Sequence, residues 1–142
     1  MRALLDVNFL IALLDASHVH HGQAHAWLDR NVHDGWASCP ITQNGCVRIL
    51  SQAAYPASKP IAEVALRLRD ATRGVNHEFW PDDVSALGDD VLDWGRILGA
   101  RQITDAYLLA LAMTHNGRLV TFDRNVPLAV VRGAAARHLA VI

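Results

Sequence analysis

Three aspartates lie where they could carry out chemistry, because each borders an apolar segment of the chain. Asp6 directly follows a short apolar run, Asp105 stands at the start of a long one, and Asp123 ends a third. Short apolar runs of this kind are typical of buried strands in a parallel sheet. Since ligands bind at the edge where such strands end, we expect the three carboxylates to gather at one edge of a sheet.

Gathered carboxylates repel one another and raise one another's pKa values unless a cation lies between them. Oxygen ligands without histidine or cysteine suit Mg²⁺, or alternatively Mn²⁺. Such an ion activates a water molecule and stabilises the charge that develops on a phosphodiester, and a second ion could enter with the substrate. The three aspartates therefore predict a metal-dependent nuclease. Each also has a structural explanation, as a turn residue, a helix cap or an acid favoured by the helix dipole.

Short apolar strands alternate with helices along the rest of the chain. Strands are expected at residues 3–5, 36–39, 75–80, 118–123 and 139–142. Helices are expected at residues 9–14, 23–30, 41–50, 61–72 and 103–113, with another beginning near Val84 and a short one within 87–96. This alternation predicts the α/β fold class, a doubly wound domain with a mainly parallel central sheet. The expected N-caps of three helices are Asn8, Thr42 and Thr104.

Histidine and cysteine pairs offer a weaker case for metal binding. His21 and His25 are four residues apart and would share one helical face. No glutamate accompanies them as in a metalloprotease helix, and no third ligand is near, so packing and capping of a helical hairpin is the favoured interpretation. Cys39 and Cys46 lack the spacing of a zinc or redox pair, which fits a reducing, cytoplasmic location.

Length and composition favour one folded domain over residues 1–142. Hydrophobic residues make up 51% of the chain and the formal net charge is -1. A protein that coats nucleic acid with a wholly basic surface is thereby excluded. Any basic surface that binds RNA must be confined to one part of the molecule. Only three apolar residues separate Arg2 from the charged Asp6, which is too short a run for a signal peptide, and no apolar run reaches membrane-spanning length. We expect neither secretion nor membrane insertion.

Four segments together resemble the PIN-domain ribonucleases and, within them, the VapC toxins of bacterial toxin–antitoxin pairs. The segments read LLDVN at residues 4–8, PITQNG at 40–45 with Arg48 after it, ITDA at 103–106 and VTFD at 120–123. Their shared order and spacing make the resemblance more specific than any one of them alone, and it covers most of the chain.

This resemblance implies a three-layer α/β/α PIN-like domain and a Mg²⁺-dependent endoribonuclease that is the toxin of a type II toxin–antitoxin system. A VapB-type antitoxin would neutralise it by covering the active site with its C-terminal segment. A homodimer is also implied, as is an RNA substrate such as tRNA or rRNA. The family's metal ligands match Asp6 and Asp105, and Asp123 completes the acidic cluster, so these three are the expected catalytic residues and metal ligands.

One position departs from the family pattern, because Gln43 stands where a glutamate is common. A neutral amide can coordinate a metal through its carbonyl or hold a water molecule, but it carries no charge and cannot act as a base. We expect Gln43 to complete the catalytic site and the metal to bind more weakly than in a four-acid site. Three explanations stay open: a tolerated natural variant, an impaired enzyme, or a substitution introduced so that a toxic protein could be produced.

Three further residues are expected near the substrate. Asn8 and Thr104 could orient the aspartates or their waters, with helix capping as the alternative for both. Arg48 is expected to contact an RNA phosphate or the antitoxin, with a surface salt bridge as the alternative.

Two other functions compete with a nuclease toxin. A catalytically weak or inactive PIN-like module could act by binding RNA or an antitoxin, and Gln43 keeps this alternative open. A phosphatase could use Asp6 as a covalent nucleophile. That chemistry usually needs a second acid shortly afterwards, where this chain has Asn8, so it is the least favoured.

Overall fold

One five-stranded sheet of order β3-β2-β1-β4-β5 forms the centre of the computed structural model, which describes residues 1–142. Its strands are β1 (Ala3–Leu5), β2 (Trp36–Ser38), β3 (His77–Phe79), β4 (Arg118–Thr121) and β5 (Leu139–Val141). Every neighbouring pair is parallel, so all five strands end at the same edge. The predicted parallel, doubly wound sheet is confirmed.

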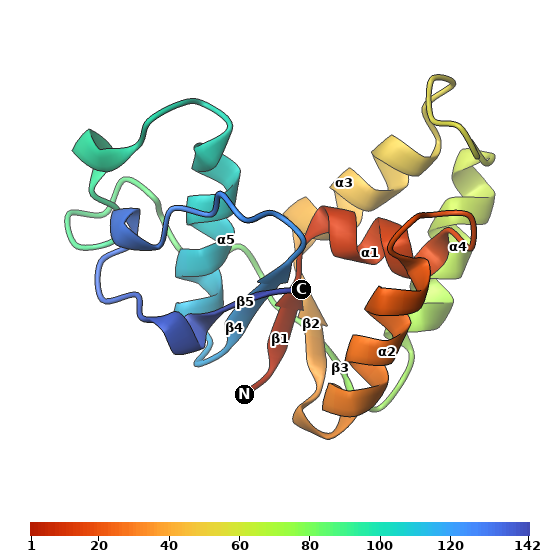
Figure 1. Ribbon diagram of the computed structural model, residues 1–142, viewed down its shortest axis with the longest axis horizontal. Helices are drawn as coiled ribbons and strands as arrows, with labels where there is room; N and C mark the ends of the chain where they lie inside the picture. Colours follow the sequence, from red (N-terminus) through yellow and green to blue (C-terminus); the bar gives the residue numbers. More distant parts are fainter.

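Four helices cover one face of the sheet and one covers the other, as Figure 1 shows. The first group is α1 (Val7–Leu14), α2 (His21–Asn31), α3 (Pro40–Leu50) and α4 (Ile61–Thr72). On the other face lies α5 (Gln102–Thr114). Short 3₁₀ helices are η1 (Val32–Asp34), η2 (Trp94–Arg96), η3 (Leu128–Val130) and η4 (Ala136–His138). The three-layer α/β/α arrangement is confirmed. None of the helices combines the length and apolar character needed to span a membrane.

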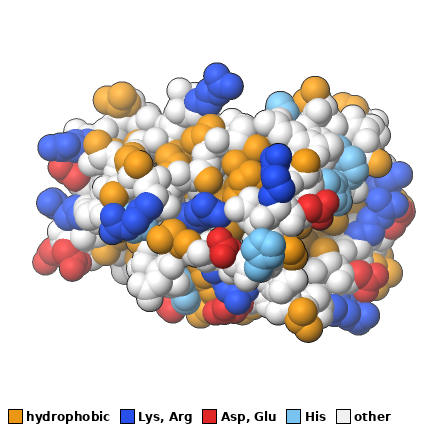
Figure 2. All heavy atoms as spheres, turned by 60° about the horizontal axis from the view of Figure 1, so that its bottom comes forward, with side chains coloured by type: hydrophobic (Ala, Val, Ile, Leu, Met, Phe, Trp, Pro, Cys, Tyr) orange, Lys and Arg blue, Asp and Glu red, His pale blue; other side chains and the backbone are white.

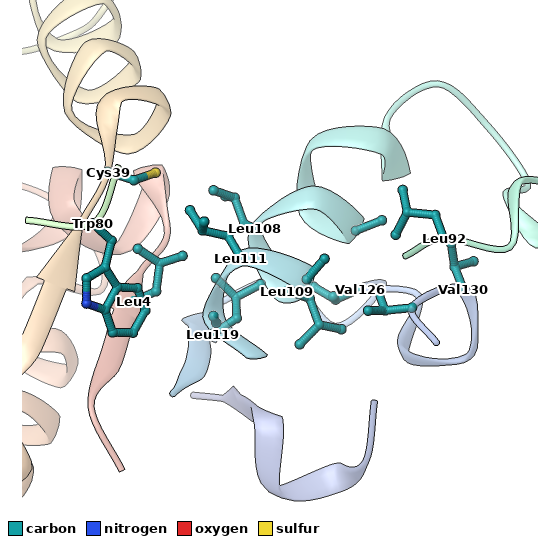
Figure 3. Packing of buried hydrophobic residues seen from close by; sticks show 14 of the residues in the cluster. Leu4, Cys39, Trp80, Leu92, Leu108, Leu109, Leu111, Leu119, Val126 and Val130 are labelled. Carbon is teal, nitrogen blue, oxygen red and sulfur yellow. The ribbon is translucent and has the colours of Figure 1, made fainter. Parts of the chain in front are cut away.

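The strand β1 sends its side chains into two separate cores. Leu4 joins the cluster on the α5 face, together with Leu108 and Leu119 (Figure 3). Leu5 points to the opposite face and packs in the cluster that contains Phe9 of α1. All five side chains are fully buried. Each buried leucine stabilises the fold by about 1.5–3 kcal/mol, so this strand is firmly held on both faces.

A tight turn between α5 and β4 fixes the start of the strand that leads to Asp123. Asn116 takes the left-handed conformation, with φ of 55°, and Gly117 donates its amide to the carbonyl of Ala112 at 2.7 Å. A Cβ at position 117 would lie 2.5 Å from the Trp80 ring, so only glycine fits there. The helix end predicted at these residues is confirmed.

Three predicted N-caps are wrong, because each helix begins before the expected residue. Asp6 caps α1 with its own carboxylate, so Asn8 lies inside the first turn. Cys39 caps α3, and Thr42 instead accepts a hydrogen bond from the Cys39 amide at 3.0 Å. The chain is already turning at residues 99–101, which places Thr104 within the first turn of α5.

The helix predicted near Val84 is wrong, and the short helix predicted within residues 87–96 is confirmed only as the 3₁₀ helix η2. This segment pairs with a distant part of the chain instead of with itself. Leu92 forms an antiparallel bridge with Val131, and the Asp93 amide donates to the Val130 carbonyl at 2.8 Å. Leu92 is consequently buried against the α5 core, which local sequence patterns do not reveal.

The two histidines at helical spacing hold the α1–α2 hairpin together, as predicted. His21 Nδ1 lies 2.7 Å from the carbonyl oxygen of Ala12, and His25 Nε2 lies 3.0 Å from that of Leu13. Both contacts close the end of α1, where carbonyl groups lack partners within the helix. The structural interpretation of this pair is confirmed.

Candidate active site

Three carboxylates from three different elements line one cavity at the edge where the strands end. Asp6 follows β1 directly, Asp123 lies two residues beyond β4, and Asp105 is in the first turn of α5. The cavity has a volume of about 530 Å³. Its other lining residues are Val7, Asn8, Ile41, Asn44, Gly45, Arg48, Ile49 and Thr104. The structure thus brings together every residue that the sequence placed at the site, with the exception of Gln43.

Asp6 is held in place by two hydrogen bonds. The amide of Val7 donates to one carboxylate oxygen at 2.7 Å, and the hydroxyl of Thr121 donates to the other at 2.8 Å. Thr121 in turn accepts the amide of Asp123 at 3.0 Å. Asp6 therefore caps α1 and lines the cavity at the same time.

Thr121 is a positioning residue that the sequence analysis did not single out. It is completely buried at the end of β4, and its hydroxyl links Asp6 to the backbone of Asp123. A polar residue that directly follows the apolar pair Leu119 and Val120, two places before an aspartate, was the available signal. Because a buried hydroxyl needs partners, that pattern could have predicted a bond to a neighbouring carboxylate.

The carboxylates make the site electrostatically unfavourable without a cation. Burial, reinforced by the charges of Asp6 and Asp123, raises the pKa of Asp105 to about 6. Burial also raises the pKa of Asp6, against the opposing hydrogen bonds from Thr121 and Val7, and the charge of Asp123 raises it further. Such like-charge arrangements are typical of functional sites.

Gln43 points away from this cavity, contrary to the expectation that it completes the site. Its side-chain amide donates to the hydroxyl of Ser38 at 2.9 Å, and that hydroxyl lies 2.8 Å from Nε2 of His77. Gln43 borders a different hollow, between α3 and α4. Asn44, one residue later and therefore about 100° further around the helix, borders this hollow too and also lines the carboxylate cavity, which Gln43 does not.

Gly45 explains how α3 comes close enough to line the cavity. A Cβ at this position would lie 2.8 Å from a methyl group of Val7, the first residue of α1. The missing side chain therefore lets α3 pack tightly against the start of α1. An acid at position 45 would have to displace Val7, so the side of the cavity formed by α3 offers the neutral amide of Asn44 and no carboxylate.

The donor chemistry of the site fits a hard divalent cation, since the available ligands are carboxylate and amide oxygens. No group of three or more histidine, cysteine or acidic side chains is gathered closely enough to hold a metal ion. Mg²⁺ commonly binds through one or two carboxylates and keeps several waters, so a complete protein shell is not required. Asp6 and Asp105 suit this role.

Three arginines flank the carboxylates without pairing with them. Arg48 lines the cavity, Arg101 precedes Asp105 by one helical turn, and Arg124 follows Asp123. All three are exposed, and none takes part in an ion pair. Arginine forks match phosphate geometry, so these side chains are available to an anionic polymer that crosses the site.

Comparison with known proteins gives a consistent answer. The model of the PIN domain family matches residues 3–132. Ribonuclease VapC44 of Mycobacterium tuberculosis is 51% identical over 142 residues, which is 100% of both chains. Ribonuclease VapC38 of the same organism is 47% identical over 126 residues, covering 87% of this chain and 86% of the relative.

Two solved structures share the fold at low sequence identity. One is Mycobacterium tuberculosis VapC20, described as a sarcin–ricin loop cleaving toxin, with a TM-score of 0.61 and 13% identity over 94% of this chain and 96% of that one. The other is VapBC2 from Rickettsia felis bound to a DNA fragment from their promoter, with a TM-score of 0.58 and 16% identity over 87% and 89%.

Proposed function

The chain belongs to the PIN-domain family and, within it, to the VapC group, and from this premise we propose that it is a Mg²⁺-dependent endoribonuclease, the toxin of a type II toxin–antitoxin system. The observation that carries the proposal is the cavity in which Asp6, Asp105 and Asp123 meet. The names of the relatives support it, since both are ribonucleases and one of them matches over the full length of this chain.

We propose Asp6 and Asp105 as the main metal ligands, with Asp123 completing the acidic cluster. When bound, Mg²⁺, or Mn²⁺ in its place, supplies Lewis-acid stabilisation of a phosphodiester oxygen and lowers the pKa of a bound water. Thr121 holds Asp6 in one orientation, so the ligand needs no rearrangement. Arg48 and Arg124 are proposed to bind the RNA phosphates on either side of the bond that is cut.

Asn8, Asn44 and Thr104 are proposed to bind the substrate or hold water in the cavity, since all three line it. Asn44 takes the place that the sequence analysis gave to Gln43. A neutral amide can orient a water molecule but cannot remove its proton. The site would therefore rely on carboxylates and metal alone for the chemical step.

The proposed partners are a VapB-type antitoxin, RNA such as tRNA or rRNA, and a second copy of this chain in a homodimer. The antitoxin has support from the VapBC2 structure, whose fold this chain shares. A cytoplasmic location remains a prediction that follows from an RNA substrate and unpaired cysteines.

Cleavage of total RNA by the purified, antitoxin-free chain tests the proposal. We expect cleavage in Mg²⁺, none in EDTA, and none with Asp6→Asn. Cleavage that persists in EDTA or in Asp6→Asn would contradict the proposed site.

One observation favours a second candidate, a weakly active or inactive module that acts by binding. Because Asn44 is a neutral amide, the cavity has three carboxylates, one fewer than a four-acid site. If cleavage appears only in Asn44→Glu, the natural chain is such a module. Gln43→Glu is the matched control, because its side chain borders a different hollow and should not change cleavage.

A further inference from the structure

We infer that His20 forms the outer end of a stacked aromatic platform beside the cavity, on which a base of a single-stranded RNA substrate rests. This inference deepens the proposed function and rests on it, since it names where a nucleotide next to the cleaved bond would lie. Four rings build the platform, and it begins inside the core.

The rings form a continuous pile from the core to the surface. Phe9 is fully buried and stacks on Phe122, with centroids 5.1 Å apart and planes 15° apart. Phe122 stacks in turn on His20, at 4.5 Å and 17°. Trp27 meets the inner face of the pile edge-on, at 5.6 Å from Phe9. Phe122 and His20 are half-buried, so the pile reaches the surface at the imidazole.

The imidazole of His20 is held in one orientation. Nδ1 of the ring lies 3.1 Å from the side-chain oxygen of Gln23. The backbone amide of His20 donates to Nδ1 of His18 at 3.0 Å. Because the Gln23 oxygen can only accept, Nδ1 carries the hydrogen and Nε2 is left as an acceptor in the neutral ring. A ring that is already fixed loses little conformational entropy when a ligand binds to it.

Two of the segments that supply the rings, those of Phe9 and Phe122, also line the carboxylate cavity. Phe9 directly follows Asn8, and Phe122 directly precedes Asp123. The platform is thus attached to the cavity wall at two points. An RNA strand with a phosphate among the aspartates would bring a neighbouring base to the pile.

The chemistry of this surface favours a base over other ligands. His18 and His20 lie 5.7 Å apart, and Val19 between them in the chain is 87% exposed. The nearest acid in sequence, Asp15, is already hydrogen-bonded to Ser17 and Tyr55. The histidines do not belong to any group of three metal ligands. A ring surface beside an unpaired apolar side chain is what single-stranded RNA uses for base stacking.

A binding measurement with matched RNA probes tests the inference. The probes are a fluorescein-labelled oligoadenylate of twelve nucleotides and an abasic strand of the same length, compared by fluorescence anisotropy. The protein carries Asp105→Asn and the buffer contains EDTA, so that RNA is bound without being cut. Variants at position 20 are His20→Ala and His20→Leu, the latter keeping an apolar cover over Phe122. His25→Ala is the control, since that imidazole contacts the Leu13 carbonyl instead.

We expect His20→Ala and His20→Leu to weaken oligoadenylate binding about tenfold, as loss of one stacked base does, and to leave binding of the abasic strand unchanged. His25→Ala should bind both probes as the parent protein does. Equal binding of oligoadenylate by the parent and both position-20 variants would overturn the inference, as would an equal loss for both probes.

The cleavage assay separates this inference from the proposed function. Cleavage by the natural chain together with unchanged binding in the position-20 variants would overturn the platform alone. Base-dependent binding through His20 without cleavage would support the platform and overturn the nuclease. Absence of both cleavage and binding would overturn both.

Discussion

Charged side chains form ion pairs at one end of the sheet and lack them at the other. At the end where the strands begin, Arg2 donates to the carbonyls of Trp36 and Asn76 at 3.2 and 2.9 Å and pairs with Glu78 at 2.9 Å. Arg118 likewise bonds to polar side chains of the α2–η1 segment. Figure 2, in which this end comes forward, shows acidic and basic side chains interspersed.

At the end where the strands stop, charges of one sign face one another. Asp6, Asp105 and Asp123 share a cavity, and the flanking arginines do not pair with them. Paired charges at the first end hold the strands together, whereas the unpaired carboxylates at the second end destabilise the fold. We take this contrast as the mark of a site that is completed by a cation and an anionic substrate.

Removal of a carboxylate should have the largest effect and should act on cleavage. Asp105→Asn deletes a proposed metal ligand, and loss of several kcal/mol of charge stabilisation corresponds to a decrease in the cleavage rate of roughly 10³-fold. The assay is Mg²⁺-dependent cleavage of total RNA. Glu78→Gln, at the other end of the sheet, is the control and should cleave at the natural rate. A comparable decrease in the cleavage rate of both variants would contradict the assignment of the site to the carboxylate end of the sheet.

Removal of a charge at the other end should act on stability. Arg2→Ala breaks the ion pair with the exposed Glu78 and removes the Arg2 donor from two backbone carbonyls, of which that of Asn76 still accepts the Trp36 amide. We expect the free energy of unfolding in urea to fall by about 1.5–3 kcal/mol, the usual range for hydrogen bonds from a charged group, with cleavage retained while the chain is folded. Arg73→Ala breaks an exposed ion pair with Asp70 at the end of α4, so it should lower the free energy of unfolding by less than about 0.5 kcal/mol. Equal effects of the two substitutions would contradict this assignment.

Loss of the Thr121 hydroxyl should weaken metal binding without removing a ligand. Thr121→Val keeps the shape of the side chain but deletes the bond to Asp6. We expect Mn²⁺ affinity, measured by titration calorimetry, to fall about 10- to 100-fold, the usual effect of losing a group that orients a ligand. Thr114→Val, which removes a hydroxyl bonded within α5, is the control. Unchanged affinity in Thr121→Val would remove Thr121 from the site.

The smallest expected effect is a dependence of stability on pH. The pKa of Asp105 is about 6 in the folded protein and about 3.9 in an unfolded chain. Above pH 6 the fold must hold this carboxylate charged, and that penalty disappears as pH falls towards 4. In EDTA, Asp105→Asn should therefore raise the melting temperature by a few degrees at pH 7.5 and by less at pH 5. A gain that is the same at both pH values would show that charge is not its cause.

Much of this contrast could be predicted from the sequence, because buried parallel strands leave clear apolar runs. Those runs predicted the end of β1 correctly and placed the end of β4 two residues too late, which was close enough to predict that Asp6 and Asp123 lie at the same edge. The apolar character of α5 likewise indicated that Asp105 heads a buried helix. Such features depend on burial, which a single sequence records well.

Features that depend on the exact rotation of a helix were predicted less well. Gln43 and Asn44 differ by one residue, and the sequence does not say which one faces the cavity. The position of α3 depends on the contact of Gly45 with Val7, which is a tertiary contact. The hydrogen bond from Thr121 to Asp6 joins residues 115 positions apart, so the sequence around Thr121 could indicate that its hydroxyl needs a partner but not that the partner is Asp6.

Thermal unfolding with and without Mn²⁺ tests most directly whether the carboxylate end of the sheet is a cation site. At pH 7.5, a metal concentration of 100 times the dissociation constant should stabilise the natural chain by about 2.7 kcal/mol. We predict that the melting temperature of the natural chain rises with Mn²⁺ while that of Asp105→Asn barely changes. An equal rise in the melting temperature of both proteins, or no rise for the natural chain, would contradict a cation site at the carboxylate end of the sheet.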